Sequence, residues 1–451
     1  MKNWAWRLLA VLAICVLASA GNARAQVQQG PLAAPTAHVE VNQLLPPGTE
    51  TFDPHKAVDA YLSRVSPQDK ARTAAYVNGG YVLSLVDVAY TLVLAALLLW
   101  LKISAGMRNI AAGITRHRFL QAPLYAMQYL ILTTVVGLPL TVYEGYFRER
   151  AYGLSNQTLL QWAGDFGIKF VVSFIAMTIL LTILYAVARA VKERWWVYGT
   201  IVTVLFLAVI VAIGPVYVAP LINHYAPLPD SAMKSTILSL AQANGIPAKD
   251  VYVFDASRQT KEISANVSGF LGTTRVSLTD NLLNRCTPSE VLAVVGHEMG
   301  HYVMNHVGTL ITWFGLLFLV LFFLVAKSFR ALTGIFGGNW DVRTIDDPAG
   351  LPLVVALFSI FALLGTPVTN TIIRTQEVQA DIFGLNAVRQ PDAFATVVLK
   401  LGEYRKLEPS PWEEFVLYDH PSGRTRIWEA MRWKAAHLHD PDILDGPVSP
   451  Q

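Results

Sequence analysis

Apolar residues occur along this chain in long runs that alternate with shorter polar segments. Six of the runs are long enough to cross a bilayer as an α-helix, which needs about 20 apolar residues; they cover residues 81–101, 119–143, 166–188, 195–218, 307–326 and 351–373. A shorter run near the N-terminus is a candidate seventh. The pattern predicts a mainly α-helical, polytopic membrane protein with six to seven transmembrane helices.

The first 25 residues are typical of a secretory signal peptide. Lys2 and Arg7 precede a short apolar run, and Ala23 and Ala25 have the small side chains and spacing that signal peptidase requires, so we expect cleavage before Gln26. The alternative is an uncleaved first membrane anchor, because residues 8–25 form a stretch of about 18 mostly apolar residues. In both cases the segment 26–80 is expected to be an exported lead, and its first half shows no periodicity.

Basic residues gather in the loops after the first, third and fifth long runs, and cytoplasmic loops are the ones that retain Lys and Arg. They are Lys102, Arg108, Arg116 and Arg118, then Arg189, Lys192 and Arg194, then Lys327, Arg330 and Arg343. We therefore expect these loops in the cytoplasm and the polar segments 221–306 and 374–451 on the exoplasmic side. An exported N-terminus requires the same orientation.

Two ionisable residues, Asp87 and Lys169, interrupt the apolar runs. Charged groups inside a membrane segment are costly unless they pair or face a polar space. Asp165 stands one helical turn before Lys169, so an interfacial ion pair between these two is expected. Asp87 has no such neighbour in sequence and is expected to face an internal cavity.

The composition agrees with a membrane protein, since 53% of the residues are hydrophobic and 15% are charged, with a mean hydropathy of +0.40. The net charge of +3, without a basic run interleaved with aromatics, predicts no nucleic-acid partner. Of the two cysteines, Cys15 lies in the signal segment, which leaves Cys286 unable to form a disulfide within the mature chain.

The candidate chemistry begins in a helix that Thr287 is expected to cap, with Glu290 completing a capping box. This helix carries the motif His297-Glu298-Met299-Gly300-His301. Residues four apart lie on one helical face, so His297 and His301 can bind one Zn²⁺. Glu298 lies beside them, where a carboxylate can take a proton from a metal-bound water.

A catalytic zinc needs a third protein ligand on the same side of the membrane. Directly after the last apolar run, Glu377 and Asp381 stand one helical turn apart. Glu377 can complete a site with one Zn²⁺ per chain, and Asp381 can hold the tautomer of a ligand imidazole. Taken alone, these two residues are typical of a solvated helix face; the histidine helix favours the metal site.

The ordered set of motifs resembles the type I CAAX prenyl proteases, which are multi-spanning membrane zinc metalloproteases, over about residues 52–432. The matching pieces are PVYVAPLINHYAPLPD at 215–230, VFDASR at 253–258, Asn266, HEMGH at 297–301 with His306 behind it, EVQAD at 377–381, His420-Pro421 and Arg426-Ile427. The resemblance implies membrane helices that enclose a zinc site, cleavage near a C-terminal prenylated cysteine, and a peptide or protein substrate.

The same resemblance assigns roles to individual residues. It implies His297, His301 and Glu377 as metal ligands, Glu298 as the general base and Asp381 as a support for a ligand. It implies that His420 lies at the site, where it could stabilise the oxyanion of the tetrahedral intermediate, and that Asn266 and Arg426 bind substrate. His306 is expected either to support the site or to be structural.

The expected organisation is therefore a helical membrane protein that encloses a zinc-metallopeptidase domain with a small β element. Four transmembrane helices occupy residues 81–220, the peptidase domain with the HExxH helix 221–306, two further transmembrane helices 307–373, and the third-ligand helix with the rest of the site 374–451. The expected location is a bacterial inner membrane with the active site toward the periplasm.

Two alternatives to CAAX processing remain open at this stage. One keeps the zinc chemistry and makes the protein a membrane quality-control protease without prenyl specificity, so that the substrate is lipidated, membrane-tethered or simply misfolded. The other is a transporter with a structural metal site. The glutamate beside His297 favours a protease, because a transporter has no need of it. The oligomeric state is not predicted.

Overall fold

The computed structural model describes residues 52–269, 273–440 and 442–443. Nearly all of them belong to the second of two compact units, Pro54–Gln451. The expected signal peptide or anchor and most of the segment before Pro54 lie outside the described residues. Residues 54–80, which were expected to be part of the lead, are largely helical: they form α2 (Pro54–Leu62) and the first turns of α3.

All six apolar runs lie largely or wholly within helices, which confirms the helical membrane fold. The helices are α3 (Pro67–Trp100), α5 (Arg118–Val142), α7 (Leu159–Val191), α8 (Trp195–Ile213), α12 (His306–Trp340) and α13 (Leu351–Val388). By length and composition the described residues contain five candidate membrane spans, and the longest of these, Leu159–Leu221, holds both α7 and α8. A short 3₁₀ turn at Lys192–Arg194 separates these two helices.

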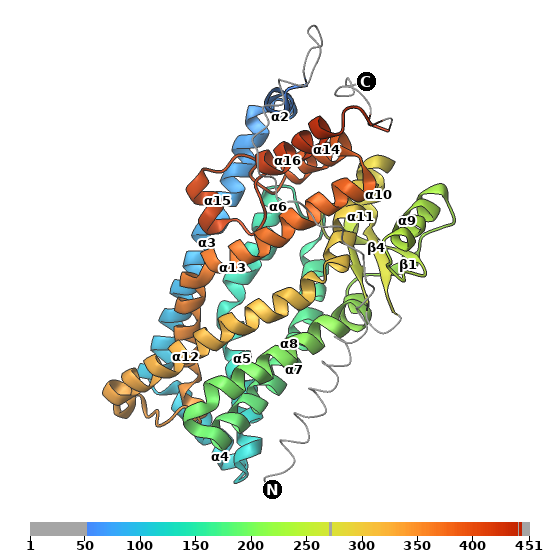
Figure 1. The fold of residues 1–451 in the computed structure, drawn as a ribbon. Helices are drawn as coiled ribbons and strands as arrows, with labels where there is room; N and C mark the ends of the chain where they lie inside the picture. The colour runs from blue at the N-terminus through green and yellow to red at the C-terminus, as the bar shows by residue number, and fades with distance from the viewer. Residues whose placement is uncertain (1–51, 270–272, 441, 444–451) are drawn as a thin grey trace. The chain divides into compact units, whose positions relative to one another are not determined.

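The three basic loops meet at one end of these helices. Leu99 of α3, Ala188 of α7, Trp195 of α8 and Phe329 of α12 belong to one buried cluster, which also includes Ala105 of α4 (Ile103–Ile114). In Figure 1 this end is marked by α4, whereas α14 (Pro391–Leu401) and α16 (Gly423–Ala436) lie at the opposite end. The loops that were expected to share one side of the membrane therefore do share one end of the molecule's second unit.

A small sheet packs at the other end, as expected. Its strand order is β1-β2-β4-β3, in which β2 and β4 are parallel and the two outer pairs are antiparallel. The strands are β1 (Tyr225–Pro227), β2 (Val251–Phe254), β3 (Ala265–Ser268) and β4 (Arg275–Thr279). Fully buried Ile237, Val276, Leu278, Val295 and Met299 join the sheet to α9 (Ala232–Ala243) and α11 (Pro288–Val303).

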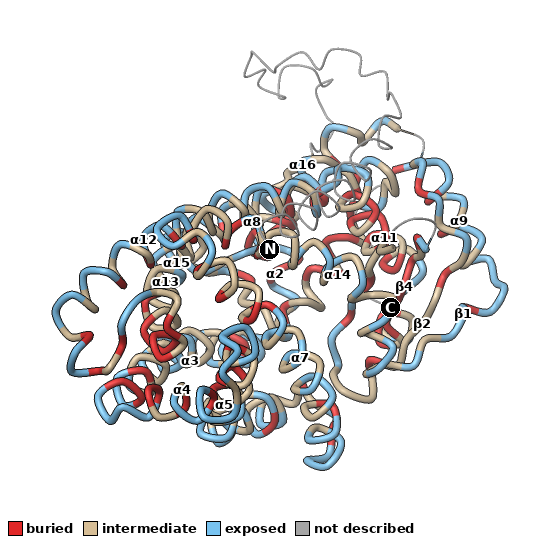
Figure 2. Tube along the Cα trace, turned by 90° about the horizontal axis from the view of Figure 1, so that it is seen from below, coloured by how far each residue is buried: buried red, intermediate tan, exposed pale blue. Residues whose placement is uncertain are grey.

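The remaining elements are short and connect these parts. They are the π-helical turns Tyr143–Arg148 and Gly214–Val218, α6 (Glu149–Ala151), the 3₁₀ turns Ala219–Leu221, Ala256–Arg258 and Pro348–Gly350, α10 (Asp280–Arg285) and α15 (Pro411–Leu417). Figure 2 shows buried residues concentrated around α11, whereas much of α12 is exposed or half-buried. Exposed apolar side chains on the long helices are what contact with lipid requires.

The prediction of an ion pair between Asp165 and Lys169 is wrong. Asp165 is buried, and its carboxylate instead accepts hydrogen bonds from Gln157 (2.6 Å), Gln259 (3.0 Å) and Arg258 (3.3 Å). These partners come from other segments, so the helical spacing to Lys169 could not reveal them. Asp87 lines an open pocket of about 570 Å³ together with Asp165 and Lys169, so it faces a hollow, but not an enclosed cavity.

Candidate metal centre and peptidase site

The helix that carries the two histidines starts as its sequence predicts. Thr287 caps α11: its hydroxyl accepts a hydrogen bond from the backbone N–H of Glu290, whose carboxylate accepts one from the N–H of Thr287 at 2.7 Å. The same carboxylate pairs with Lys400 of α14 at 2.6 Å. The capping box is therefore also a tertiary contact, which fixes the N-terminus of α11 against α14.

Small residues allow α11 to approach α13 closely. A Cβ atom on Gly300 would lie 3.0 Å from the Cα of Ala380, and one on Gly384 would lie 2.9 Å from the backbone nitrogen of His297. Helices packed through small residues can bring their backbones nearly into contact. This approach places the histidine face of α11 directly opposite Glu377 and Asp381 of α13.

The structure brings together the three residues with the donor types of a metal site. His297, His301 and Glu377 each offer a ligand atom, and these atoms lie within 4.8 Å of one another. The Nε2 atoms of the two histidines are 3.1 Å apart, and the Glu377 carboxylate lies 3.3 Å from His297 and 3.5 Å from His301. The Oε2 atom of Glu377 is buried without a hydrogen-bond partner in the described part of the chain, as expected of an atom that a cation would satisfy.

Asp381 fixes the orientation of His297. Its Oδ1 accepts a hydrogen bond from Nδ1 of His297 at 2.7 Å, which leaves Nε2 facing Glu377. Arg426 of α16 donates two further bonds to the same carboxylate, at 2.8 and 2.6 Å. Burial by itself lowers the pKa of His297, but the hydrogen bond to Asp381 and the nearby carboxylate of Glu377 outweigh it and raise the pKa to about 10.

A second chain of hydrogen bonds orients His301. The amide oxygen of Gln379 lies 3.2 Å from Nε2 of His306, and Nδ1 of His306 lies 2.9 Å from Nδ1 of His301. Since an amide oxygen only accepts, neutral His306 has its proton on Nε2 and accepts from His301. Nε2 of His301 then carries a lone pair, which faces Nε2 of His297 at 3.1 Å. Burial, followed by the nearby charge of His297, lowers the pKa of His301 to about 4.

Glu298 and His420 line a cavity of about 120 Å³ together with His297, Glu377 and Arg426. Burial, assisted by the charge of Glu377, raises the pKa of Glu298 to about 7 against the opposing effect of His297. Nε2 of His420 lies 3.3 Å from the Glu377 carboxylate, while its Nδ1 bonds to Asp419 at 2.8 Å. Both groups therefore face the space beside the ligand cluster.

Asn266 lies on β3, the edge strand that packs against α11. Ser264 and Ala265 line the cavity, whereas Asn266 is one residue further along and accepts a hydrogen bond from Ser268 at 2.9 Å. The N–H of Thr279 bonds to the carbonyl of Ser264, so the alternation of an antiparallel pair turns the backbone groups of Ala265 and Val267 toward the free edge. The edge beside the cavity is thus open to an extended peptide.

Sequence reasoning missed Gln379, Asp419 and the wall that α14 contributes. That wall consists of Phe394, Val397, Val398 and Leu401. The sequence did contain a signal for this wall: its other three residues follow Phe394 by three, four and seven positions, which is the spacing of one helical face. Gln379 had none, since only the packing of α13 against the start of α12 brings it to His306.

Comparison with known proteins agrees with this geometry. The profile of peptidase family M48 matches residues 227–434, and that of the CAAX prenyl protease N-terminal region, described as five membrane helices, matches residues 53–224. An uncharacterised metalloprotease of Bacillus subtilis, YhfN, is 31% identical over 379 residues, which cover 84% of this chain and 89% of the relative. CAAX prenyl protease 1 of Saccharomyces cerevisiae is 28% identical over 66% of this chain and 69% of its own length.

A solved structure shares the fold. The crystal structure of S. mikatae Ste24p superposes with a TM-score of 0.71 at 20% identity, covering 81% of this chain and 90% of that one. The long membrane helices are thus found in the part of the chain that matches the CAAX prenyl protease N-terminal profile, and the small sheet and the donor cluster in the part that matches the M48 profile. The chain belongs to peptidase family M48, among the type I CAAX prenyl proteases, and is an integral membrane metallopeptidase.

Proposed function

We propose that the protein is a zinc metalloendopeptidase that hydrolyses peptide bonds of membrane-associated substrates. The observation that carries the proposal is the cluster of His297, His301 and Glu377 beside Glu298 in one cavity. Two imidazoles and a carboxylate are a common donor set for a catalytic zinc with an open position. The buried Oε2 of Glu377, which has no hydrogen-bond partner among the residues that the structure describes, supports the fit, as do the occupied Nδ1 atoms of both histidines.

In this proposal each residue has one task. A bound zinc ion would act as a Lewis acid and lower the pKa of a water molecule. Glu298, with a pKa near neutrality in the metal-free chain, takes the proton from the attacking water and passes it to the leaving amine. His420 donates a hydrogen bond to the developing oxyanion, and Asp419 orients its ring.

Arg426 acts on the site through Asp381. Both of its bonds go to that carboxylate and its side chain is buried, so we assign it a positioning role in place of the substrate contact that the sequence suggested. The substrate backbone would instead pair with the free edge of β3, through Ala265 and Val267, next to the predicted residue Asn266.

The substrate class depends on which side of the membrane the site faces. The similarity to CAAX prenyl protease 1 supports the proposal that this protein cleaves prenylated C-termini. The basic loops at the opposite end favour a site outside the cytoplasm, and that location favours quality control of membrane-tethered proteins. Family membership removes the reason to retain the transporter alternative.

The test is cleavage of a farnesylated CAAX peptide and its unprenylated twin by the full chain in detergent, with a chelator and Glu298→Gln as controls. Cleavage that depends on the prenyl group and is lost in Glu298→Gln supports CAAX processing. Equal, chelator-sensitive cleavage of both peptides supports the quality-control alternative. Protein that binds no stoichiometric zinc, or keeps its activity in Glu298→Gln, contradicts the proposed chemistry.

A further inference from the structure

The short helix α15 exposes aromatic side chains and turns its acidic side chains toward the protein. Trp412 is 73% exposed and Phe415 is 50% exposed, and their rings lie next to each other with centroids 5.9 Å apart. The acidic residues between them are turned into the protein. Glu413 binds Lys406 at 2.8 Å, and Glu414 accepts from the backbone N–H of Ser422 at 2.8 Å. A helix on an aqueous surface shows the opposite arrangement.

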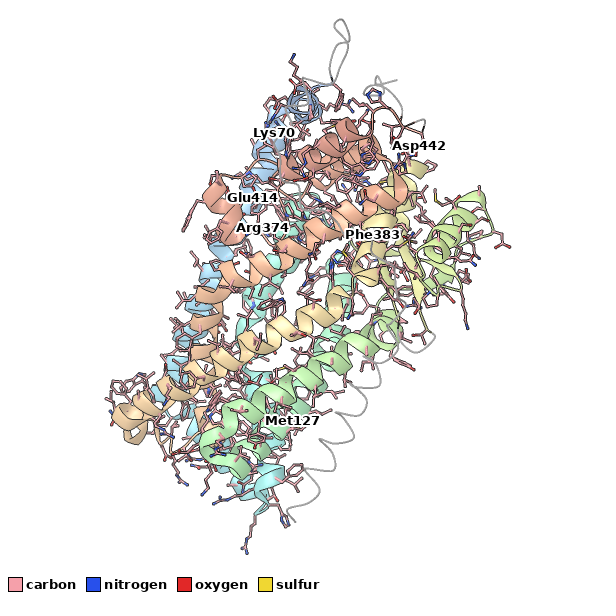
Figure 3. The ribbon with its side chains drawn as sticks, in the orientation of Figure 1. Lys70, Met127, Arg374, Phe383, Glu414 and Asp442 are labelled. Atoms are coloured by element: carbon pink, nitrogen blue, oxygen red, sulfur yellow. The ribbon has the colours of Figure 1, made fainter. Side chains whose placement is uncertain are left out.

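Contacts with two membrane helices, α13 and α3, both place α15 level with the end of an apolar run. On α13, Asn370 donates to the carbonyl of Val416 at 2.9 Å and Arg374 donates to that of Glu414 at 2.7 Å. These two residues straddle the end of the apolar run 351–373, and Figure 3 shows Arg374 beside Glu414. On α3, the hydroxyl of Tyr81, at the start of the run 81–101, bonds to Glu413 at 3.3 Å.

The apolar patch on α15 lies near the end of a helix, α13, that carries exposed apolar residues in its membrane part. Leu364 and Val368 are 70% and 51% exposed on the membrane part of α13, and α15 packs against that helix about one turn further along. Aromatic residues at the end of a membrane span are typical of the boundary between acyl chains and headgroups. The occupant that this surface fits is therefore the bilayer itself.

We propose that α15 is an interfacial helix, with Trp412 and Phe415 inserted into the bilayer at the end of α13 where the site lies. The helix leads directly into the loop that carries His420. The backbone carbonyl of Tyr418, two residues before His420, accepts a hydrogen bond from Arg374 at 2.5 Å. Glu377 stands four residues beyond the apolar run, a rise of about 6 Å. The inserted helix thus holds the His420 loop at the membrane surface, where a substrate tethered to lipid is presented.

The first test measures depth and needs no proteolysis. In a Cys15→Ser, Cys286→Ser background in nanodiscs of phosphatidylethanolamine and phosphatidylglycerol, a fluorescent label is attached to Trp412→Cys or Phe415→Cys. Leu364→Cys is the reference for lipid and Asp230→Cys, whose side chain is 99% exposed, is the reference for water. The labels on α15 are expected to be quenched by lipids with spin-labelled headgroups and protected from iodide.

Iodide quenching equal to that of Asp230→Cys overturns the proposal. Protection from both quenchers also overturns it, because a second copy or another protein would then cover the patch. The second test rests on the proposed peptidase activity. The double variant Trp412→Gln, Phe415→Gln should lose about five- to tenfold in kcat/KM for a lipid-anchored peptide and keep its rate on the same soluble peptide. An equal loss on both peptides, or no loss on either, contradicts the role in presenting substrate.

Discussion

At the scale of single residues, Asp381 determines both the direction of His297 and the charge balance of the site. Its carboxylate is 2% exposed and binds both His297 and Arg426. A carboxylate that ionises in such a place depends on these partners, and each of them depends on it. The sequence suggested the contact with a histidine from the spacing of Glu377 and Asp381. The contact with Arg426 comes from α16 and could not be found by spacing.

Asp381→Asn should weaken zinc binding by about 10–100-fold, because an amide holds the His297 tautomer poorly. A competition titration with a chromophoric chelator measures this affinity. Asp392→Asn is the matched control, since Asp392 is also a carboxylate bound to a buried base, Lys434, at 2.5 Å, but lies away from the cluster. It should lower stability without changing zinc affinity. Equal affinities for both variants would argue against the role of Asp381.

The protonation of His297 predicts how zinc affinity depends on pH. With a pKa raised to about 10, His297 is protonated in the metal-free chain at neutral pH, whereas a ligand imidazole must be neutral. His301, with its pKa lowered to about 4, already is neutral. Zinc therefore displaces one proton, and its affinity should rise by about tenfold per pH unit between pH 6 and pH 9. Calorimetry in buffers of different ionisation enthalpy counts the proton; a flat affinity profile would refute the assignment.

At the scale of elements, the close approach of α11 and α13 creates the site. Gly384→Ala would place a methyl group 2.9 Å from the backbone of His297, which cannot move without shifting the ligand. We expect lower zinc content and lower activity in folded protein. Gly365→Ala is the control on the same helix, because a Cβ there meets nothing within 4 Å. Zinc content and thermal unfolding of both variants test this; equal zinc content would show that the approach can relax.

The elements differ in how far the sequence predicts them. The long apolar runs and the Thr287 capping box are local patterns, and the structure confirms both. The starts of α2 and α3 were missed because residues 54–80 are too polar to appear as a membrane span. The hydrogen bonds that link His301 to His306 and His306 to Gln379 depend on the angle between α11 and α12. No local sequence pattern encodes that angle.

At the scale of the whole second unit, the basic loops and the peptidase site occupy opposite ends of the membrane helices. The loops share one buried cluster, and the donor cluster lies beyond the other end of α13. A helix that spans the bilayer must place its two ends on different sides. From this geometry the positive-inside rule predicts an orientation with the site outside the cytoplasm.

Thiol labelling in a bacterial inner membrane tests this orientation. In a chain without other cysteines, Asp230→Cys should react with a membrane-impermeant reagent in cells with a permeabilised outer membrane, and Arg116→Cys should react only after lysis. Both positions are exposed and lie outside the site, so both variants should keep their peptidase activity, which controls for folding. The opposite labelling would place the site in the cytoplasm, where prenylated proteins are made, and would favour CAAX processing. The expected labelling leaves lipid-anchored or misfolded periplasmic proteins as the substrates within reach of Glu298.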